Sequence, residues 1–119
     1  MSAEVVLLFL LVIKHSFADL FLQTYNKNID KTKYLGNGQK HYLQHSFLTL
    51  LITLNFTSIW LAIAVAVLDH IAHWHIDFWK SLCVRMFHVD RASGKFFRIQ
   101  TLDQMLHFLT YFIIVAIVF

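Results

Sequence analysis

Histidine and aspartate residues recur in this chain at a spacing of four, within its most apolar stretches. The chain has eight histidines and six aspartates, and random placement would give about 1.6 His/Asp pairs at that spacing. Five pairs occur, at positions 15/19, 41/45, 69/73, 73/77 and 103/107. Residues four apart lie on one face of an α-helix, one turn from each other. The spacing therefore predicts helices that each present imidazole and carboxylate groups on one face.

Imidazole and carboxylate groups together are ligands that suit zinc, iron or manganese. Inward His and carboxylate side chains on the helices of a bundle are a known way to build two-metal sites. Because eight candidates exceed the needs of one tetrahedral ion, we expect two ions, or one ion whose histidines are oriented by outer carboxylates. Zinc is the favoured ion, and its bound water would become a nucleophile at neutral pH. The predicted ligands are His15, Asp19, His41, His45, His73, Asp77, Asp103 and His107.

Further polar residues extend the same helix faces. Lys80 lies three residues after Asp77, and Gln23 lies four residues after Asp19. Both side chains can therefore reach the mouth of the predicted site and bind an anionic group such as a phosphate. Gln104, in the last apolar stretch, is counted with Gln23 as a binding residue. The predicted catalytic residues are Asp19, Asp77 and Lys80.

The composition favours a membrane protein. Of 119 residues, 58% are hydrophobic and 14% are charged, whereas a soluble domain carries about 25% charged residues. The apolar content excludes disorder, and the single cysteine, Cys83, excludes a disulfide framework or a cysteine-rich zinc site. Since about 17 to 25 apolar residues cross a bilayer as a helix, we expect an all-α, four-helix transmembrane bundle. The predicted spans are 3–23, 41–55, 57–79 and 102–119, all within one domain.

Two polar segments, 24–40 and 80–101, join these spans and hold nine of the ten basic residues in or beside them. Four spans place both segments on one side of the membrane, and both termini with the turn at 55–58 on the other. Because cytoplasmic loops are rich in Lys and Arg, we expect both loops in the cytoplasm and both termini on the non-cytoplasmic side. The loops attract anionic lipid headgroups, which explains the pI near 9.2 without a nucleic-acid partner.

The same topology places the His/Asp pairs at one depth. The first and third spans run toward the cytoplasm and carry their pairs near their C-terminal ends, whereas the second and fourth carry theirs near the N-terminal ends. The pairs of all four helices are therefore expected to meet in one chamber close to the cytoplasmic face. Lys14, which precedes His15, either snorkels toward the interface or enters this chamber.

Four ordered motifs carry a resemblance to a known family. They are His15-x-x-x-Asp19-x-x-x-Gln23, the pair His41 and His45, His73-x-x-Ile-Asp77-x-x-Lys80, and Asp103-Gln104-x-x-His107. In this pattern the chain resembles a family of small bacterial and phage membrane proteins known only as a domain of unknown function. The resemblance implies a place in the bacterial inner membrane, and it implies no activity.

Three functions fit the predicted chamber. The first is a metal-dependent hydrolase of a lipid or lipid-linked phosphate, because headgroups and a metal-activated water would meet at the cytoplasmic interface. The second is a transporter for metal ions or protons, since His/Asp chains also serve as relays. The outer halves of the spans offer few polar groups, so a complete path would require a homo-oligomer. The third is a non-catalytic membrane subunit in which the polar layer stabilises the bundle or a partner docks on the basic loops.

Overall fold

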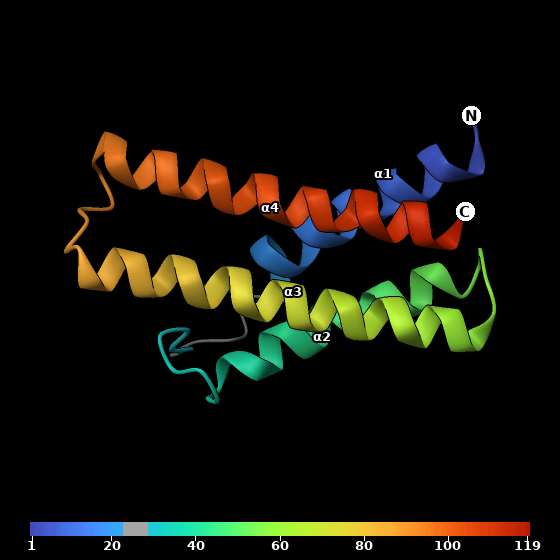
Figure 1. Ribbon diagram of the computed structural model, residues 1–119, viewed down its shortest axis with the longest axis horizontal. Coiled ribbons are helices and arrows are strands. Elements are labelled where there is room, and N and C mark those ends of the chain that lie inside the picture. The colour runs from blue at the N-terminus through green and yellow to red at the C-terminus, as the bar shows by residue number, and fades with distance from the viewer. Residues whose placement is uncertain (23–28) are drawn as a thin grey trace.

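A computed structural model describes residues 1–22 and 29–119 of the chain. Within these residues it has four α-helices, one π-helical turn and no β-strand, which confirms the all-α prediction. The elements in Figure 1 are α1 (Ala3–Ser16), η1 (Phe17–Phe21), α2 (Gly38–Thr53), α3 (Ile59–Met86) and α4 (Gly94–Val118).

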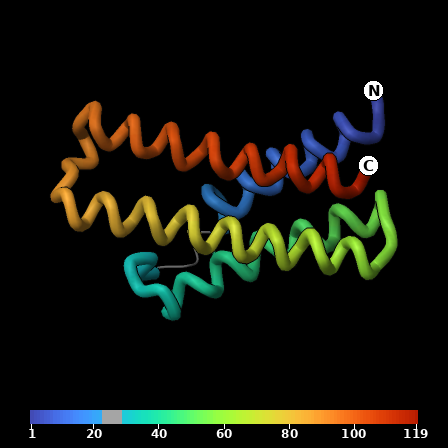
Figure 2. Tube along the Cα trace, in the orientation of Figure 1, coloured from blue at the N-terminus to red at the C-terminus, as the bar shows by residue number. Residues whose placement is uncertain are grey.

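The helices form a bundle in which α1 and α3 each contact both α2 and α4. Both termini and the turn between α2 and α3 lie at one end of the bundle, and the α3–α4 connection lies at the opposite end (Figure 2). The segment 29–37, which precedes α2, is fastened to α3. The ring of Tyr34 lies 4.5 Å from that of Trp74, and the indole Nε1 of Trp74 donates a 2.8 Å hydrogen bond to the Tyr34 carbonyl.

Serine caps define the starts of three helices. The hydroxyls of Ser2, Ser58 and Ser93 each accept a hydrogen bond from the amide three residues later, which satisfies one free N–H group of the first turn. The turn predicted at 55–58 agrees with the structure, because α2 ends at Thr53 and α3 begins at Ile59.

Helices α3 and α4 extend beyond the spans predicted from the sequence. Helix α3 continues past residue 79 to Met86, and α4 begins at Gly94 rather than at residue 102. Lys, Arg and Gln are good helix formers when their side chains reach water, so the charged residues there do not interrupt the helices. After α3 the chain turns at His88, whose φ of 48° is the left-handed conformation that often follows a helix. The predicted loop 80–101 is therefore helical over most of its length.

The first predicted span is not α-helical throughout. Residues Phe17–Phe21 form the π-helical turn η1 directly after α1. A π-helical turn closes its hydrogen bonds five residues apart, is rare, and often lies at a functional site. Despite the wider turn, Nε2 of His15 lies 3.0 Å from Oδ2 of Asp19, so the predicted pair still faces one way.

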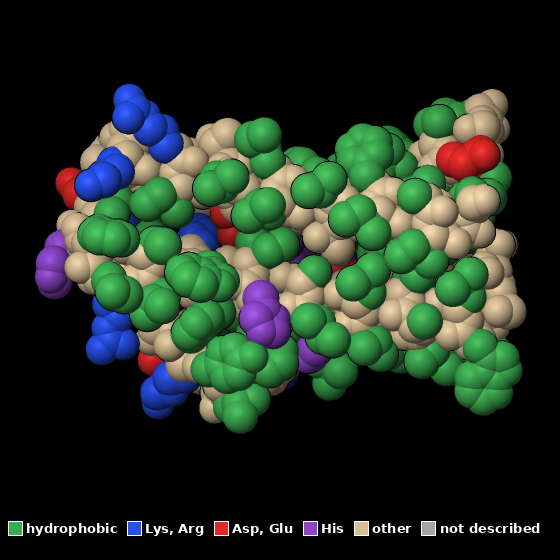
Figure 3. Space-filling model, viewed as in Figure 1, with side chains coloured by type: hydrophobic (Ala, Val, Ile, Leu, Met, Phe, Trp, Pro, Cys, Tyr) green, Lys and Arg blue, Asp and Glu red, His purple; other side chains and the backbone are tan. Residues whose placement is uncertain are grey.

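The bundle is apolar on its flanks and polar inside along part of its length. Every helix exposes large hydrophobic side chains, and such side chains cover the flank in Figure 3, whereas Lys and Arg gather at the end with the α3–α4 connection. An apolar core fills the end that holds the termini, and it consists of Leu7, Leu11, Val65, Tyr111 and Ile114. In the described part of the chain two helices, α3 and α4, are long and apolar enough to cross a membrane.

Candidate metal centre

The predicted His and Asp ligands lie together inside the bundle, next to the apolar core. Elements α1 and η1 contribute the first pair, α2 the second, α3 the third and α4 the fourth. All these side chains are buried except that of Asp19, which is partly exposed. Imidazoles from different helices are in contact, since the ring centroid of His73 lies 3.8 Å from that of His45 and 4.3 Å from that of His107. The fold thus gathers residues from four separate stretches of the chain.

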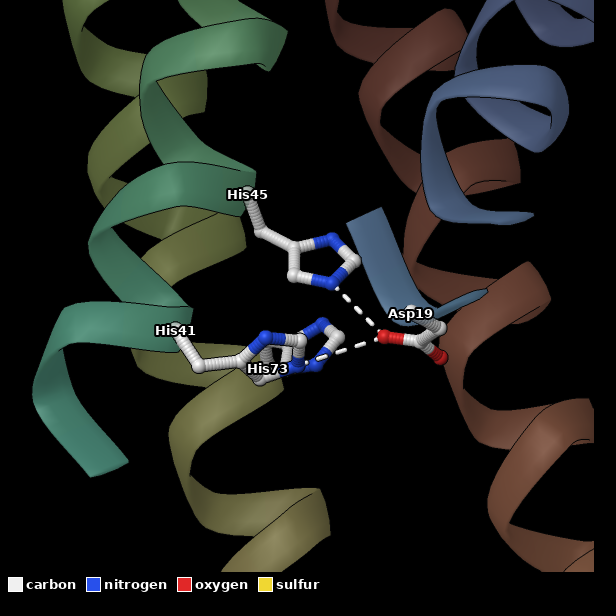
Figure 4. Close-up of side chains that lie close together, drawn as sticks. All are labelled: Asp19, His41, His45 and His73. Atoms are coloured by element: carbon white, nitrogen blue, oxygen red, sulfur yellow. Dashed lines mark hydrogen bonds and ion pairs between the residues drawn. The ribbon is translucent and has the colours of Figure 1, made fainter. Parts of the chain in front are cut away.

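One group of ligand-type side chains consists of Asp19, His41, His45 and His73. Their ligand atoms lie within 4.8 Å of one another, and Figure 4 shows the imidazoles of α2 and α3 around the carboxylate. Oδ1 of Asp19 lies 2.8 Å from Nε2 of His45 and 3.2 Å from Nε2 of His41. Three imidazoles and one carboxylate form a set that suits a tetrahedral ion such as zinc.

A second group consists of His73, Asp77 and His107. The two carboxylate oxygens of Asp77 lie 3.2 Å from Nε2 of His73 and 3.3 Å from Nε2 of His107. Nδ1 of His107 donates a 2.7 Å hydrogen bond to the main-chain carbonyl of Asp103. In the neutral ring the Nε2 lone pair then faces a carboxylate oxygen, and a cation between two such acceptors would bind both. Histidines that ligate metals are commonly fixed by this kind of carbonyl contact at the other nitrogen.

One buried nitrogen atom of the chamber, Nδ1 of His73, has no hydrogen-bond partner among the described residues. The Nε2 atoms of His73 and His107 both face the carboxylate of Asp77. A buried polar atom left without a partner costs about 1–3 kcal/mol, so such atoms are rare in folded proteins. His73 belongs to both groups, so it could contact an ion in either. The residues present therefore fit a metal ion.

His15 and Tyr111 support the first group from outside it. Nε2 of His15 lies 3.0 Å from Oδ2 of Asp19 and 3.2 Å from Oε1 of Gln104, so this nitrogen carries the proton. Nδ1 then accepts a 2.7 Å hydrogen bond from the hydroxyl of Tyr111. Both nitrogens of His15 are thus used within the protein, and the ring orients the Asp19 carboxylate instead of joining either group.

Asp103 likewise borders the second group without belonging to it. Its Oδ2 accepts a 2.9 Å hydrogen bond from Nε2 of Gln104 and lies 3.7 Å from Nζ of Lys80. Gln104 and Lys80, both predicted site residues, therefore reach the chamber. Gln23, the other predicted binding residue, lies outside the described residues.

A buried ion pair that the ligand prediction omitted lies on the core side of the histidines. Nζ of Lys14 is 2.9 Å from Oδ2 of Asp69 and 3.3 Å from Nδ1 of His45, and Thr49 donates to the same carboxylate oxygen. Lys14 is only 4% exposed, so it enters the chamber and does not snorkel. The signal was present in the sequence, because Lys14 follows Leu11 by three residues and continues the stripe that faces the core.

Two adjoining cavities open from the chamber. The first, of about 320 Å³, is bordered by Asp19, Asp77 and Asp103. The second, of about 560 Å³, shares Lys31, Asp77 and Lys80 with the first, and we name it the basic cavity. Its charged lining side chains are Lys31, Lys80, Arg85, Arg91, Asp30 and Asp77. Four cations and two carboxylates leave an excess of two positive charges at the mouth of the candidate site.

Two contacts within the basic cavity set its charge distribution. Nζ of Lys31 lies 2.9 Å from Oδ2 of Asp77, so the segment 29–37 reaches the second group of ligands. The hydroxyl and amide of Thr32 donate to Asp30, and these hydrogen bonds hold the pKa of Asp30 below its usual range. Lys31, Arg85 and Arg91 were not among the predicted site residues, because loop cations carry no pattern that separates them from ordinary solvated charges.

Fold and site together define a class of protein: an all-α bundle with apolar flanks and a buried His/Asp chamber that could hold a metal ion. Within that class, the chain belongs to the family described as "Protein of unknown function (DUF3307)", whose model matches residues 7–119. The match confirms the resemblance seen in the sequence. Comparisons with curated proteins and with solved structures give no match.

Proposed function

We propose that the His/Asp chamber binds one or two divalent metal ions and that the protein is a metal-dependent hydrolase of a lipid or lipid-linked phosphate. The position of Asp77 carries this proposal. Its carboxylate faces His73 and His107 in the chamber, and it also contacts Lys31 in the basic cavity. A phosphate group held by the cations would therefore lie next to the metal ligands.

The distribution of side chains supports four spans in a bacterial inner membrane. All four helices expose apolar side chains while their buried faces carry His and Asp, the reverse of a water-soluble bundle. Lys and Arg gather at one end of the molecule in Figure 3, and the segments at the other end contain none. The positive-inside rule then favours a cytoplasmic basic end and non-cytoplasmic termini.

The ligand types favour zinc, with iron or manganese as alternatives. The first group offers three imidazoles and one carboxylate, which is enough for a four-coordinate ion. The second group offers two imidazoles, one of which is the shared His73, and one carboxylate, which would leave a coordination position for water. We therefore place the reactive ion in the second group, beside the basic cavity.

Each chamber residue then has a chemical role. A divalent ion held there would lower the pKa of bound water and so supply a nucleophile for phosphorus at neutral pH. Asp77 would hold this ion together with His73 and His107, and Asp19 would hold the first group together. Lys80, which lines both cavities, would donate to a phosphate oxygen and stabilise the charge that develops there. The P–O bond to the leaving group would break, which is an ester bond in phosphatidic acid and an anhydride bond in a polyprenyl diphosphate. The proton given up by the water would pass to the leaving oxygen.

The test uses the full chain purified in detergent. Metal content is measured by mass spectrometry, and phosphate release is measured with phosphatidic acid and with a polyprenyl diphosphate. We expect stoichiometric metal and metal-dependent release, both lost in Asp77→Asn. Asp90→Asn, which neutralises an exposed carboxylate in the α3–α4 connection, is the matched control. Stoichiometric metal without release from either substrate would reject the hydrolase, and absence of metal would reject the whole proposal.

One observation favours a second function, transport of protons or metal ions. The pair Lys14 and Asp69 extends the polar layer beyond the histidines toward the other end of the bundle. Beyond that pair, however, the apolar core closes the interior of the bundle. The described residues of a single chain thus form no continuous polar path, and a transporter would require several copies. Metal or proton flux into proteoliposomes, with no phosphate release, would favour this alternative.

A further inference from the structure

A groove on the flank of the bundle adjoins the candidate site. It lies between α3 and α4, has a volume of about 290 Å³, and is lined mainly by apolar side chains. On α3 these are Ile76, Trp79 and Cys83, and on α4 they are Ile99, Leu102 and Leu106. The spacings of three and four keep each set on one helix face. Trp79 and Leu102 are 62% and 57% exposed, so the groove opens sideways from the bundle.

Lys80 joins this groove to the basic cavity. Its side chain lines the groove, the basic cavity and the smaller cavity that holds Asp19 and Asp103. Asp103 also lines both the groove and the smaller cavity. A ligand with an anionic group next to a hydrocarbon chain would therefore place the junction of the two at Lys80.

We infer that the basic cavity and this groove together bind a phosphate-bearing lipid, with the phosphate among the cations and the hydrocarbon chain between α3 and α4. The inference rests on the proposed function for the reaction, but binding does not depend on a metal. The lipid substrate would enter sideways from the bilayer, along α3 and α4.

Charge makes the ligand an anionic lipid. Four cations against two carboxylates favour an anion in the cavity. Arg85 and Arg91 are exposed there, and guanidinium groups bind phosphate oxygens through paired hydrogen bonds. In a bilayer any lipid would fill an apolar groove, so the cations provide the preference. A neutral lipid would leave them unmatched, and a free phosphate would make no use of the groove.

The experiment follows the tryptophan emission of the chain and isolates the share of Trp79 by comparison with Trp79→Phe. The full chain is placed in phosphatidylcholine nanodiscs with a chelator, and a small fraction of lipid is replaced by phosphatidic acid with brominated acyl chains. Bromine quenches a nearby indole. We expect brominated phosphatidic acid to quench more than brominated phosphatidylcholine at the same mole fraction, and we expect Trp79→Phe to remove this difference. Equal quenching by the two lipids, or a difference that survives in Trp79→Phe, would overturn the inference.

Matched variants separate the cavity from general surface charge. Arg85→Gln combined with Arg91→Gln should lower the preference for phosphatidic acid about five-fold for each cation removed. Lys95→Gln combined with Arg98→Gln removes the same charge from side chains that do not line the cavity, and should change the preference little. An equal loss in both double variants would mean that the surface charge alone attracts the lipid, and would overturn the inference.

The source of the phosphate is tested separately. Cys83→Phe places a ring in the groove and should reduce quenching by phosphatidic acid, whereas Cys83→Ala should not. If inorganic phosphate abolishes the preference while Cys83→Phe has no effect, the cavity serves a free anion and the lipid inference is wrong. A retained preference in a protein that binds no metal would reject the proposed function and leave this inference standing.

Discussion

Lys14 and Asp69 form an ion pair inside the bundle, with Nζ 2.9 Å from Oδ2 and both side chains almost fully buried. They lie 55 residues apart in the chain, on α1 and α3. The pair separates the histidine chamber from the apolar core, and it therefore holds the two helices in register where the chemistry of the interior changes.

The first prediction concerns this pair. Lys14→Met leaves the Asp69 carboxylate buried without its cation, and breaking a buried pair costs about 3–5 kcal/mol. We expect a clearly lower midpoint of unfolding in SDS, followed by circular dichroism. Lys14→Met combined with Asp69→Leu removes both charges and should recover much of the loss. If the double variant is as unstable as the sum of both single variants, the two charges are not coupled.

A second prediction concerns the histidine shared by both groups. His73→Ala removes a ligand-type side chain from each group, so the bound metal per chain should fall toward zero in mass spectrometry of the purified protein. His75→Ala, two residues along α3, removes an imidazole that contacts Tyr34 outside the chamber, and should keep its metal. Metal retained by the His73 variant would place the ion elsewhere.

The third prediction concerns the hydroxyl of Tyr111, whose removal should weaken metal binding without abolishing it. It donates to His15, which orients Asp19, and loss of such a supporting contact typically weakens metal binding about 10–100-fold. We expect Tyr111→Phe to raise the dissociation constant for zinc into this range, measured by competition with a chelating dye. Tyr34→Phe removes a hydroxyl that contacts His75, away from the chamber, and should leave the constant unchanged.

Metal should also stabilise the fold. Ligand at about 100 times its dissociation constant stabilises the folded state by about 2.7 kcal/mol. Treatment with a chelator should lower the melting temperature in detergent, and zinc should restore it. The His73→Ala variant should show no response to either treatment. A wild-type melting temperature that is indifferent to chelator would contradict metal binding in the chamber.

The proposed topology predicts opposite accessibility for two serines. In a Cys83→Ser background, Ser2→Cys should react with an impermeant thiol reagent added outside intact bacterial spheroplasts. Ser93→Cys, in the α3–α4 connection, should react only after the membrane is opened. Labelling of both positions from the same side would exclude an arrangement in which the two ends of the bundle face opposite compartments.

The sequence allowed the chamber to be predicted because its signal is local. A spacing of four fixes two side chains on one helix face. Because successive helices run in opposite directions, the histidines are placed at a similar level along the bundle; they are His15, His41, His73 and His107. The contacts between their helices follow from that geometry. The contact among these histidines could therefore be predicted without knowing which distant residues pair with each other.

Other features depend on contacts that no spacing reveals. The reach of Lys31 to Asp77 spans 46 residues and depends on how the segment 29–37 folds back onto α3. The separation of His15 from the ligand groups depends on Tyr111 and Gln104, whose side chains occupy its two nitrogens. Every chamber histidine shares the same local pattern, so only the three-dimensional partners distinguish a supporting ring from a ligand-type ring.

The π-helical turn η1 has a consequence for the geometry of the first segment. An α-helix turns by about 100° per residue, whereas a π-helix turns by less, so η1 changes the angle at which Asp19 leaves the helix axis relative to α1. The stripe that ends at Lys14 can thus fit the core independently of where Asp19 must sit. Shortening the segment by one residue would swing the carboxylate around the helix axis while the upstream packing stayed in place.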